Sequence, residues 1–285
     1  MLEKYFVSLQ ALGDNLISLS LLYQMDGHVQ IIGTKHTQSI ITLMGVEDKF
    51  DLLVPFEDIP AFYDIRKQGI FKAIKDIIIF RSYVKKHNIK ELIFEKYDWR
   101  AKFLTFAIAC YIAKNTTKQV YINRKNLFDF CYEGNFKLKN SLKPSKKIQK
   151  ILINPIAREQ KRSISKEHLK IIFEVLKSCN IQIILLDYSG DYHEFKNLVN
   201  KYWSHTRLNE AKNIMQDCDF FIGTDSFLIH LAYYLEKPFF IIFNFEYFDF
   251  LPPNCEVLNN YVITSNCRCF KKDITLKFKD IGLIV

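Results

Sequence analysis

The sequence lacks any apolar run long enough to cross a membrane. The longest such run, residues 103–113, is flanked by Lys102 and Lys114. It falls far short of the roughly 20 residues that a spanning helix needs. The amino terminus carries Glu3 and Lys4 and no long apolar core, so the sequence predicts no signal peptide. We therefore expect a cytoplasmic protein without an integral membrane segment.

Patterns typical of metal sites and nucleic-acid binding are also missing. The seven cysteines are odd in number, and several lie in or beside apolar runs, which predicts reduced, buried thiols. Cys267 and Cys269 form a C-x-C without a second pair, so we interpret them as structural thiols and not as zinc ligands. No D-x-D carboxylate pair stands in a suitable loop, and no RNA-recognition motif is present. The sequence thus predicts no metal and no nucleic-acid partner.

Acidic residues are fewer than basic ones, 31 against 40, which gives a formal net charge of +9. A lysine-rich background composition would explain this excess. Attraction to an anionic partner would explain it equally well. The charge alone leaves both explanations open.

The chain length and the apolar content predict two folded domains. Apolar residues make up 49% of 285 residues, which is enough for a real core. In the first half we expect strands at 5–9, 29–32, 51–54 and 92–94, and helices at 16–22, 37–44, 71–86 and 101–113. In the second half we expect strands at 151–154, 181–186, 220–222 and 238–243, and helices from Ser165 and at 193–203, 210–217 and 227–235. A Lys-, Asn- and Ser-rich stretch at 135–150 reads as a linker. This alternation predicts an α/β protein with parallel sheets, divided into domains 1–145 and 146–285.

Three loops between a strand and a helix carry groups with chemical potential. In the first, Gly13 is expected to allow a tight turn, and Asp14 then stands at the carboxyl end of a strand, where ligands bind in open α/β sheets. Asp14 can cap the helix, or it can act as a general base. The second loop, at 155–162, contains Arg158, Lys161 and Arg162 and leads to a helix start, which favours anions.

The third loop is the most informative one. Thr224, Asp225 and Ser226 follow Gly223 directly before a predicted helix. The apolar stripe of that helix is Leu228, Leu231, Ala232 and Leu235, so we expect His230 to lie off the core face, on the face that it shares with Ser226. Small polar groups, a histidine and the free amides of a first helical turn suit a diphosphate.

These three loops, in this order, resemble glycosyltransferase family 9, the heptosyltransferases of lipopolysaccharide core synthesis. The likeness lies in Leu12-Gly13-Asp14, in Asn154-Pro155 through Lys161-Arg162, and in Gly223-Thr224-Asp225-Ser226 through His230-Leu231-Ala232, followed by Lys237-Pro238. The resemblance implies the GT-B fold, with two Rossmann-like domains facing a cleft. The first domain would bind the acceptor and the second the nucleotide sugar.

The resemblance also implies a role for each site residue. Asp14 would be the base that activates the acceptor, Lys161 would contact the donor phosphate, and Asp191 would contact the ribose. The donor-binding motif would comprise Thr224, Asp225, Ser226 and His230. No acceptor-binding residue is predicted.

The implied activity is inverting, metal-independent transfer of a heptose or related sugar from a nucleotide sugar to a lipopolysaccharide or lipooligosaccharide core acceptor. ADP-heptose is the candidate donor, no separate cofactor is expected, and an anionic glycolipid would be the acceptor. Peripheral contact with the inner membrane would follow. Phe227 stands where the family usually has Gly, and Ser163-Ile164 replaces its usual Trp-Pro. These departures leave open a hexosyl or hexosaminyl transferase, a nucleotide-sugar epimerase on the same fold, or a non-catalytic nucleotide-sugar-binding relative.

Overall fold

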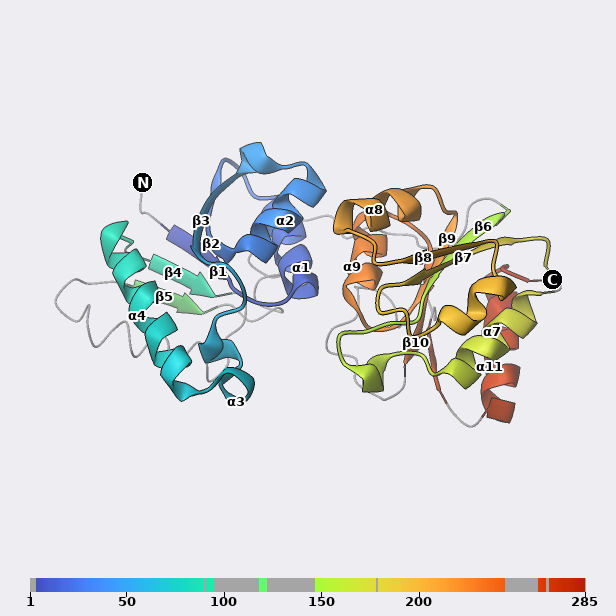
Figure 1. Cartoon of the computed structure of the whole chain (residues 1–285). Coiled ribbons are helices and arrows are strands. Elements are labelled where there is room, and N and C mark those ends of the chain that lie inside the picture. The colour runs from blue at the N-terminus through green and yellow to red at the C-terminus, as the bar shows by residue number, and fades with distance from the viewer. Residues whose placement is uncertain are drawn as a thin grey trace. The chain divides into compact units, whose positions relative to one another are not determined.

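The chain forms two compact α/β units, Met1–Lys137 and Leu138–Val285 (Figure 1). The computed structural model describes residues 4–89, 91–94, 118–121, 147–177, 179–243, 261–264 and 267–284. The helix expected at 101–113, the domain boundary expected after residue 145 and most of the linker expected at 135–150 lie outside these residues.

The first unit is built on a parallel five-stranded sheet with the order β3-β2-β1-β4-β5. Its strands are β1 (Lys4–Ser8), β2 (Val29–Thr34), β3 (Phe50–Phe56), β4 (Glu91–Phe94) and β5 (Lys118–Tyr121). Its described helices are α1 (Leu12–Leu22), α2 (Lys35–Met44), α3 (Ile65–Gln68) and α4 (Ile70–Lys86), with 3-10 turns η1 (Glu47–Lys49) and η2 (Ala61–Tyr63). The strand order reverses between β1 and β4, which places ligand-binding loops at the carboxyl ends of these strands.

Helix α4 covers the first sheet with one apolar face. Ala73, Ile77, Phe80 and Val84 are buried in a cluster with side chains of β1, β2 and β4. Their spacing follows the helical repeat, which explains why the predicted helix at 71–86 forms and where it packs. Asp76, the helix's one acidic residue, is also buried, and its carboxylate accepts a 2.6 Å hydrogen bond from the Ala61 amide. This bond fixes the loop that precedes η2.

The second unit is a parallel six-stranded sheet with the order β11-β10-β9-β6-β7-β8. Its strands are β6 (Lys150–Asn154), β7 (Gln182–Asp187), β8 (Lys201–Ser204), β9 (Phe220–Gly223), β10 (Phe239–Phe243) and β11 (Tyr261–Ile263). Its described helices are α7 (Lys166–Leu176), α8 (Leu208–Gln216), α9 (Phe227–Tyr234) and α11 (Cys267–Asp280), with 3-10 turns η3 (Gln160–Arg162) and η4 (His193–Leu198). This order is that of a Rossmann sheet, with its switch point between β6 and β9.

Helix α7 confirms the pattern read from the sequence. Its predicted stripe of Leu169, Ile172, Phe173 and Leu176 lies in the core of the second unit, together with α11 side chains such as Phe270. The Ser165 side chain accepts a hydrogen bond from the His168 amide, so Ser165 is the N-cap that the sequence predicts.

Two expectations from the sequence are wrong in detail. The helix expected at 193–203 is only the turn η4, after which Trp203 lies in strand β8, paired with β7. Tyr202 and Trp203 favour the β-conformation, and they form an edge strand because β7 lies beside them as a pairing partner. This neighbour is not visible in the local sequence pattern, which therefore predicted a helix.

The cysteines are the second case, because only some of them are buried as expected. Cys218 is buried, and burial raises the pKa of its thiol to about 12. Cys267 and Cys269, however, are exposed on the first turn of α11.

No helix within the described ranges combines the length and the apolar character needed to span a bilayer.

The two phenylalanines of α4 provide a test of its orientation. Phe80 is fully buried, whereas Phe71 is 87% exposed on the same helix. We expect Phe80→Ala to destabilise the first unit by about 3–5 kcal/mol through lost burial and a residual cavity. Phe71→Ala is the matched control and should change stability by about 0.5 kcal/mol or less. Chemical denaturation followed by circular dichroism measures both, and equal losses would contradict this orientation.

Candidate active site

The polar groups of the second unit gather where β6 and β9 end side by side. Asn154, the last residue of β6, pairs in register with Gly223, the last residue of β9. The Asn154 side-chain amide donates a 2.8 Å hydrogen bond to the Leu186 carbonyl of the neighbouring β7. A Cβ on Gly223 would meet the buried Phe221 ring at 2.6 Å, so glycine is required for this close packing. The loops that follow β6 and β9 therefore start next to each other.

An ion pair joins these two loops. Arg162 of η3 donates from Nη1 to Asp225 Oδ2 at 2.9 Å, and the side chains are only 25% and 11% exposed. The Thr224 hydroxyl donates to the Arg162 carbonyl, so a second bond crosses between the loops. Charged hydrogen bonds with little solvent around them fix geometry more firmly than exposed pairs do. The predicted Thr224 and Asp225 thus share one cluster with Arg162.

The loop after β6 is held in shape by its own residues. The Ala157 amide donates to the Ser163 hydroxyl at 2.9 Å, and the Ile164 amide donates to the Pro155 carbonyl at 2.8 Å. Ile164 is fully buried. The Ser163-Ile164 pair, which departs from the family's Trp-Pro, therefore has a clear structural role: it closes this loop and anchors it to the core.

Helix α9 begins at this cluster with polar atoms that lack partners. Ser226 is its N-cap in extended conformation, without a side-chain capping bond. Among the described residues, the buried Oγ of Ser226 and the buried Nε of Arg162 make no hydrogen bond. Buried polar atoms are normally paired, so two donors without partners at one site indicate a missing ligand. The first-turn amides of α9 add further donors and the positive end of the helix dipole.

His230 does not lie where the sequence predicted. We expected it off the core face of α9, yet it is only 7% exposed. Leu228, Ile229, Leu231 and Ala232 are also buried, so α9 is enclosed on nearly all sides and has no open polar face. His230 therefore lies inside the second unit, one turn after Ser226.

Lys161 and Asp191, which were also predicted to bind the donor, are both exposed. Lys161 is 77% exposed, with Nζ 3.1 Å from a Glu159 carboxylate oxygen. Asp191 was expected early in a helix, but it stands in the loop before η4, where its carboxylate accepts a 2.6 Å bond from the Ser189 hydroxyl. The roles of Lys161 and Asp191 in donor binding stay predictions.

Asp187 organises the loop that carries Asp191, and the sequence analysis missed it. This fully buried carboxylate accepts 2.9 Å bonds from the Gly190 and Tyr192 amides and a 2.6 Å bond from the Tyr202 hydroxyl. Burial, followed by this hydrogen bond, raises the pKa of Tyr202 to about 12. The position of an aspartate at the carboxyl end of β7 was the signal that could have revealed it.

In the first unit, Asp14 lies in the first turn of α1. Gly13 lies inside the same helix, so the tight turn expected at Gly13 is wrong and is made by residues 9–11. The N-cap residue of α1 is Ala11, whose side chain makes no capping hydrogen bond. The half-buried Asp14 lies at the edge of the sheet where β1 ends.

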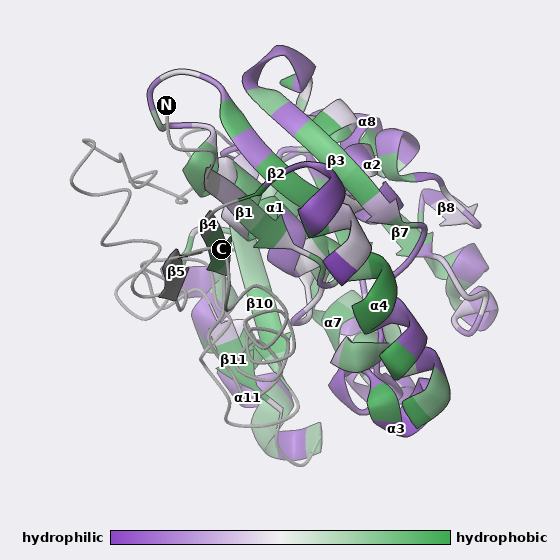
Figure 2. Cartoon of the chain, turned by 90° about the vertical axis from the view of Figure 1, so that its left-hand side faces the viewer, coloured by the Kyte–Doolittle hydropathy of each residue, from purple (hydrophilic) through white to green (hydrophobic). Residues whose placement is uncertain are grey.

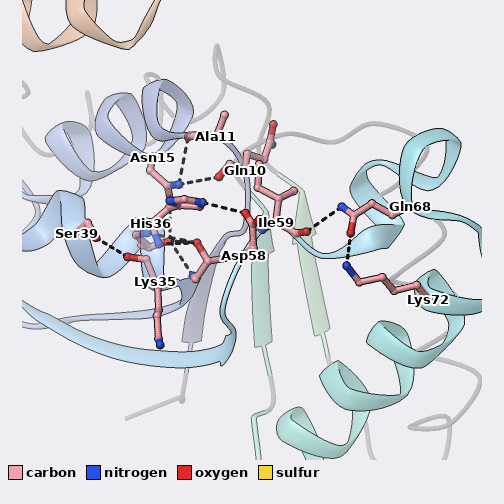
Figure 3. A network of polar contacts seen from close by, with 12 residues as sticks. Gln10, Ala11, Asn15, Lys35, His36, Ser39, Asp58, Ile59, Gln68 and Lys72 are labelled. Atoms are coloured by element: carbon pink, nitrogen blue, oxygen red, sulfur yellow. Dashed lines mark hydrogen bonds and ion pairs between the residues drawn. The ribbon is translucent and has the colours of Figure 1, made fainter. Parts of the chain in front are cut away.

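Asn15 holds the Asp14 turn in place (Figure 3). Its side-chain oxygen accepts from the hydroxyls of Ser8, at 2.6 Å, and Thr37, at 2.9 Å. Its amide donates to the Gln10 and Ala11 carbonyls at 2.9 and 3.2 Å. The loop after β1 and the start of α2 are therefore locked to one fully buried side chain.

A histidine–aspartate pair lies beside this network. His36 Nε2, in the first turn of α2, is 2.9 Å from Oδ1 of Asp58, which follows β3 (Figure 3). Lys35 pairs with Glu57 next to it. No local sequence pattern marks these groups, because His36 and Asp58, 22 residues apart, meet only through the pairing of β2 with β3.

The two ion pairs of the loop after β6 allow an internal comparison. In a double-mutant cycle of Arg162→Met and Asp225→Asn, we expect a coupling free energy of about 1–3 kcal/mol, because water is largely excluded from this pair. The exposed pair Lys161–Glu159, tested with Lys161→Met and Glu159→Gln, should couple by about 1 kcal/mol or less. Thermal and urea denaturation supply the values. Equal coupling in the two cycles would show that the Arg162–Asp225 bond does not organise the site.

Comparison with known proteins identifies a family. Residues 125–278 match the model of glycosyltransferase family 9 (heptosyltransferase). Comparison with curated protein sequences finds no match.

Solved structures show where the fold recurs. The chain is similar to E. coli heptosyltransferase WaaC with ADP-2-deoxy-2-fluoro heptose, at 12% identity and a TM-score of 0.59, covering 95% of this chain and 98% of that one. It is similar to E. coli ADP-heptose lps heptosyltransferase II, at 11% identity and a TM-score of 0.60, covering 98% of each chain. It is also similar to UDP-GlcNAc 2-epimerase from Neisseria meningitidis bound to UDP-GlcNAc, at 8% identity and a TM-score of 0.55, covering 98% and 92%. These likenesses establish the GT-B fold of two Rossmann-like domains.

The family match spans more than half of the chain and includes both loops of the β6–β9 cluster. The chain therefore belongs to glycosyltransferase family 9, the heptosyltransferase family, and is a glycosyltransferase.

Proposed function

We propose that this glycosyltransferase moves a heptose or a related sugar from a nucleotide sugar, ADP-heptose being the candidate donor, to a lipopolysaccharide or lipooligosaccharide core acceptor. We further propose that the reaction inverts the anomeric configuration and needs no metal ion and no separate cofactor. The observation that carries the proposal is the cluster of Arg162, Thr224, Asp225 and Ser226 at the switch point of the second sheet.

This cluster suits the diphosphate of the donor. Ser226 Oγ and Arg162 Nε are buried donors without partners among the described residues, and the α9 amides open beside them. A diphosphate supplies acceptor oxygens for all of these donors and negative charge for the guanidinium. Asp225 holds Arg162 in its orientation, so its own role is positioning. Lys161, on the same loop, has the reach and the charge to add a further contact. Asp191 is proposed to contact the ribose.

In the proposed reaction, the Asp14 carboxylate takes the proton of an acceptor hydroxyl. The acceptor oxygen forms a bond to the anomeric carbon of the sugar while the bond from that carbon to the donor phosphate oxygen breaks. The electron pair of the broken bond leaves with the nucleoside diphosphate. Attack from the side opposite to the leaving group inverts the anomeric centre. The developing charge is stabilised by Lys161, Arg162, the α9 amides and His230.

Replacing the base isolates the chemical step. Asp14→Asn should lower the transfer rate by about 10²–10⁴-fold, the usual contribution of a positioned base, and leave donor affinity unchanged. Asp26→Asn, an exposed carboxylate of the same unit, is the matched control. Transfer is measured with ADP-heptose and a lipopolysaccharide core acceptor, with and without EDTA, and the product is read by NMR. Full activity of Asp14→Asn would refute the assignment of Asp14 as the base. A product with retained anomeric configuration would refute inversion. Loss of activity in EDTA would refute metal independence.

Measuring donor affinity tests the proposed donor site of the second unit independently of the transfer reaction. We expect Lys161→Ala to weaken nucleotide-sugar binding by about tenfold or more, because one charged contact to the phosphate is lost. Lys170→Ala, an exposed lysine on α7, is the control. Calorimetry with a panel of ADP-, UDP- and GDP-sugars gives the affinities and identifies the donor. Unchanged affinity in Lys161→Ala would remove Lys161 from the site. Preferential binding of UDP-N-acetylglucosamine with conversion to another sugar would favour the epimerase alternative.

A further inference from the structure

Helix α4 has a second apolar face that points to solvent. Opposite its buried face, Ile70, Phe71, Ile74 and Ile78 are 60%, 87%, 48% and 55% exposed. Positions 70, 74 and 78 are one turn apart and Phe71 lies beside them, so the four side chains form one stripe along the helix. Within the described residues, half of the eight large hydrophobic side chains that are exposed belong to this stripe. Scattered exposed apolar residues are ordinary, but a contiguous stripe marks an interaction surface.

Apart from Asp76, the charged side chains of α4 are all cationic. The cationic side chains of α4 are Lys72, Lys75, Arg81, Lys85 and Lys86, and α3 before it adds Arg66 and also Lys67, which pairs with Asp64 at 3.9 Å. The helix's single acid, Asp76, is buried on the opposite face. The solvent face of α4 therefore carries apolar, cationic and a few neutral side chains, and the acid of the helix is not exposed there. Figure 2 shows hydrophobic and hydrophilic residues interspersed along the α4 ribbon.

A hollow continues the cationic part of this face. A cavity of about 550 Å³ is lined by Ile78, Arg81, Ser82, Lys85 and Lys86. Its lining combines cations and a hydroxyl at one end of the apolar stripe. Such a hollow has the size and the donors for an anionic headgroup, whose acyl chains would continue along the stripe.

We propose that α4 docks the first unit on an anionic lipid bilayer, with Ile70, Phe71, Ile74 and Ile78 in the boundary between headgroups and acyl chains. The flanking cations would then contact the lipid phosphates, as in other interfacial amphipathic helices. Charge complementarity selects this partner over a second copy of the chain, because two α4 faces packed together would oppose their own lysines. The inference rests on the proposed function in one respect, because the glycolipid acceptor of that function lies at a membrane surface.

Vesicle co-flotation tests the proposal with the full chain. The protein should bind vesicles that contain phosphatidylglycerol, bind vesicles of phosphatidylcholine alone far less, and lose binding as salt is added. Phe71→Ser combined with Ile78→Ser should weaken partitioning by at least about tenfold, since one buried apolar side chain contributes that much. Lys75→Gln and Lys86→Gln should each weaken it by about fivefold, and only on anionic vesicles.

Matched controls lie in the second unit. Leu276→Ser, at a side chain 52% exposed on the lysine-rich α11, and Lys170→Gln on α7 should bind like the unaltered protein. Circular dichroism checks that every variant is folded. The proposal is overturned if the protein ignores anionic vesicles, if the Phe71→Ser, Ile78→Ser variant binds them normally, or if that variant merely converts a dimer to a monomer in solution. Nucleotide-sugar binding, measured separately without vesicles, keeps a failure of the proposed function distinguishable from a failure of docking.

Discussion

The parallel pairing of β6 with β9 is the constraint on which the candidate site depends. These strands are neighbours in the sheet although about 65 residues separate them in the sequence, and their last residues, Asn154 and Gly223, stand in register. Because the chain leaves both strands at the same edge, the loop with Arg162 and the loop with Asp225 must meet. The ion pair and the Thr224 hydroxyl bond between these loops are consequences of this pairing. Without the pairing of β6 with β9, the basic loop and the acidic loop would not contact each other.

The first unit uses the same principle with neutral groups. Its switch point lies between β1 and β4, and the loop after β1 is fixed by Asn15 through hydroxyls of β1 and α2. A fully buried, fully bonded amide gives a rigid turn without placing a second charge beside the Asp14 carboxylate. A residue that is proposed to exchange a proton benefits from such a neighbour. The two units thus hold their working groups by different means, a charge pair in one and a neutral amide in the other.

Sequence patterns predicted what depends on short-range periodicity. The α7 stripe, the Ser165 cap and the alternation of strands and helices follow from residues at most four positions apart, and these predictions are confirmed. The errors occur where the environment decides. His230 is buried because neighbouring elements enclose α9, and Trp203 joins a strand because β7 offers an edge. Arg162 was noted only as part of a basic loop, and its bond to Asp225 was not predicted, because the two residues lie 63 positions apart and meet only in the folded sheet. The His36–Asp58 pair was missed for the same reason.

In the described part of the molecule, some buried polar atoms lack hydrogen bonds and some large apolar side chains are exposed. Both features indicate surfaces that bind a ligand or another partner. Ser226 Oγ and Arg162 Nε are polar atoms withdrawn from water without a hydrogen bond, a state that costs free energy until a ligand supplies acceptors. Phe71 and Ile78 are the reverse case, apolar groups left in water, which a lipid phase would relieve. The buried polar atoms would be satisfied by a compact anion. The exposed apolar side chains would be covered by an extended apolar surface that is bordered by negative charge. A nucleotide sugar and an anionic membrane have these complementary properties, and the proposed transfer of a sugar to a glycolipid would bring the protein to both.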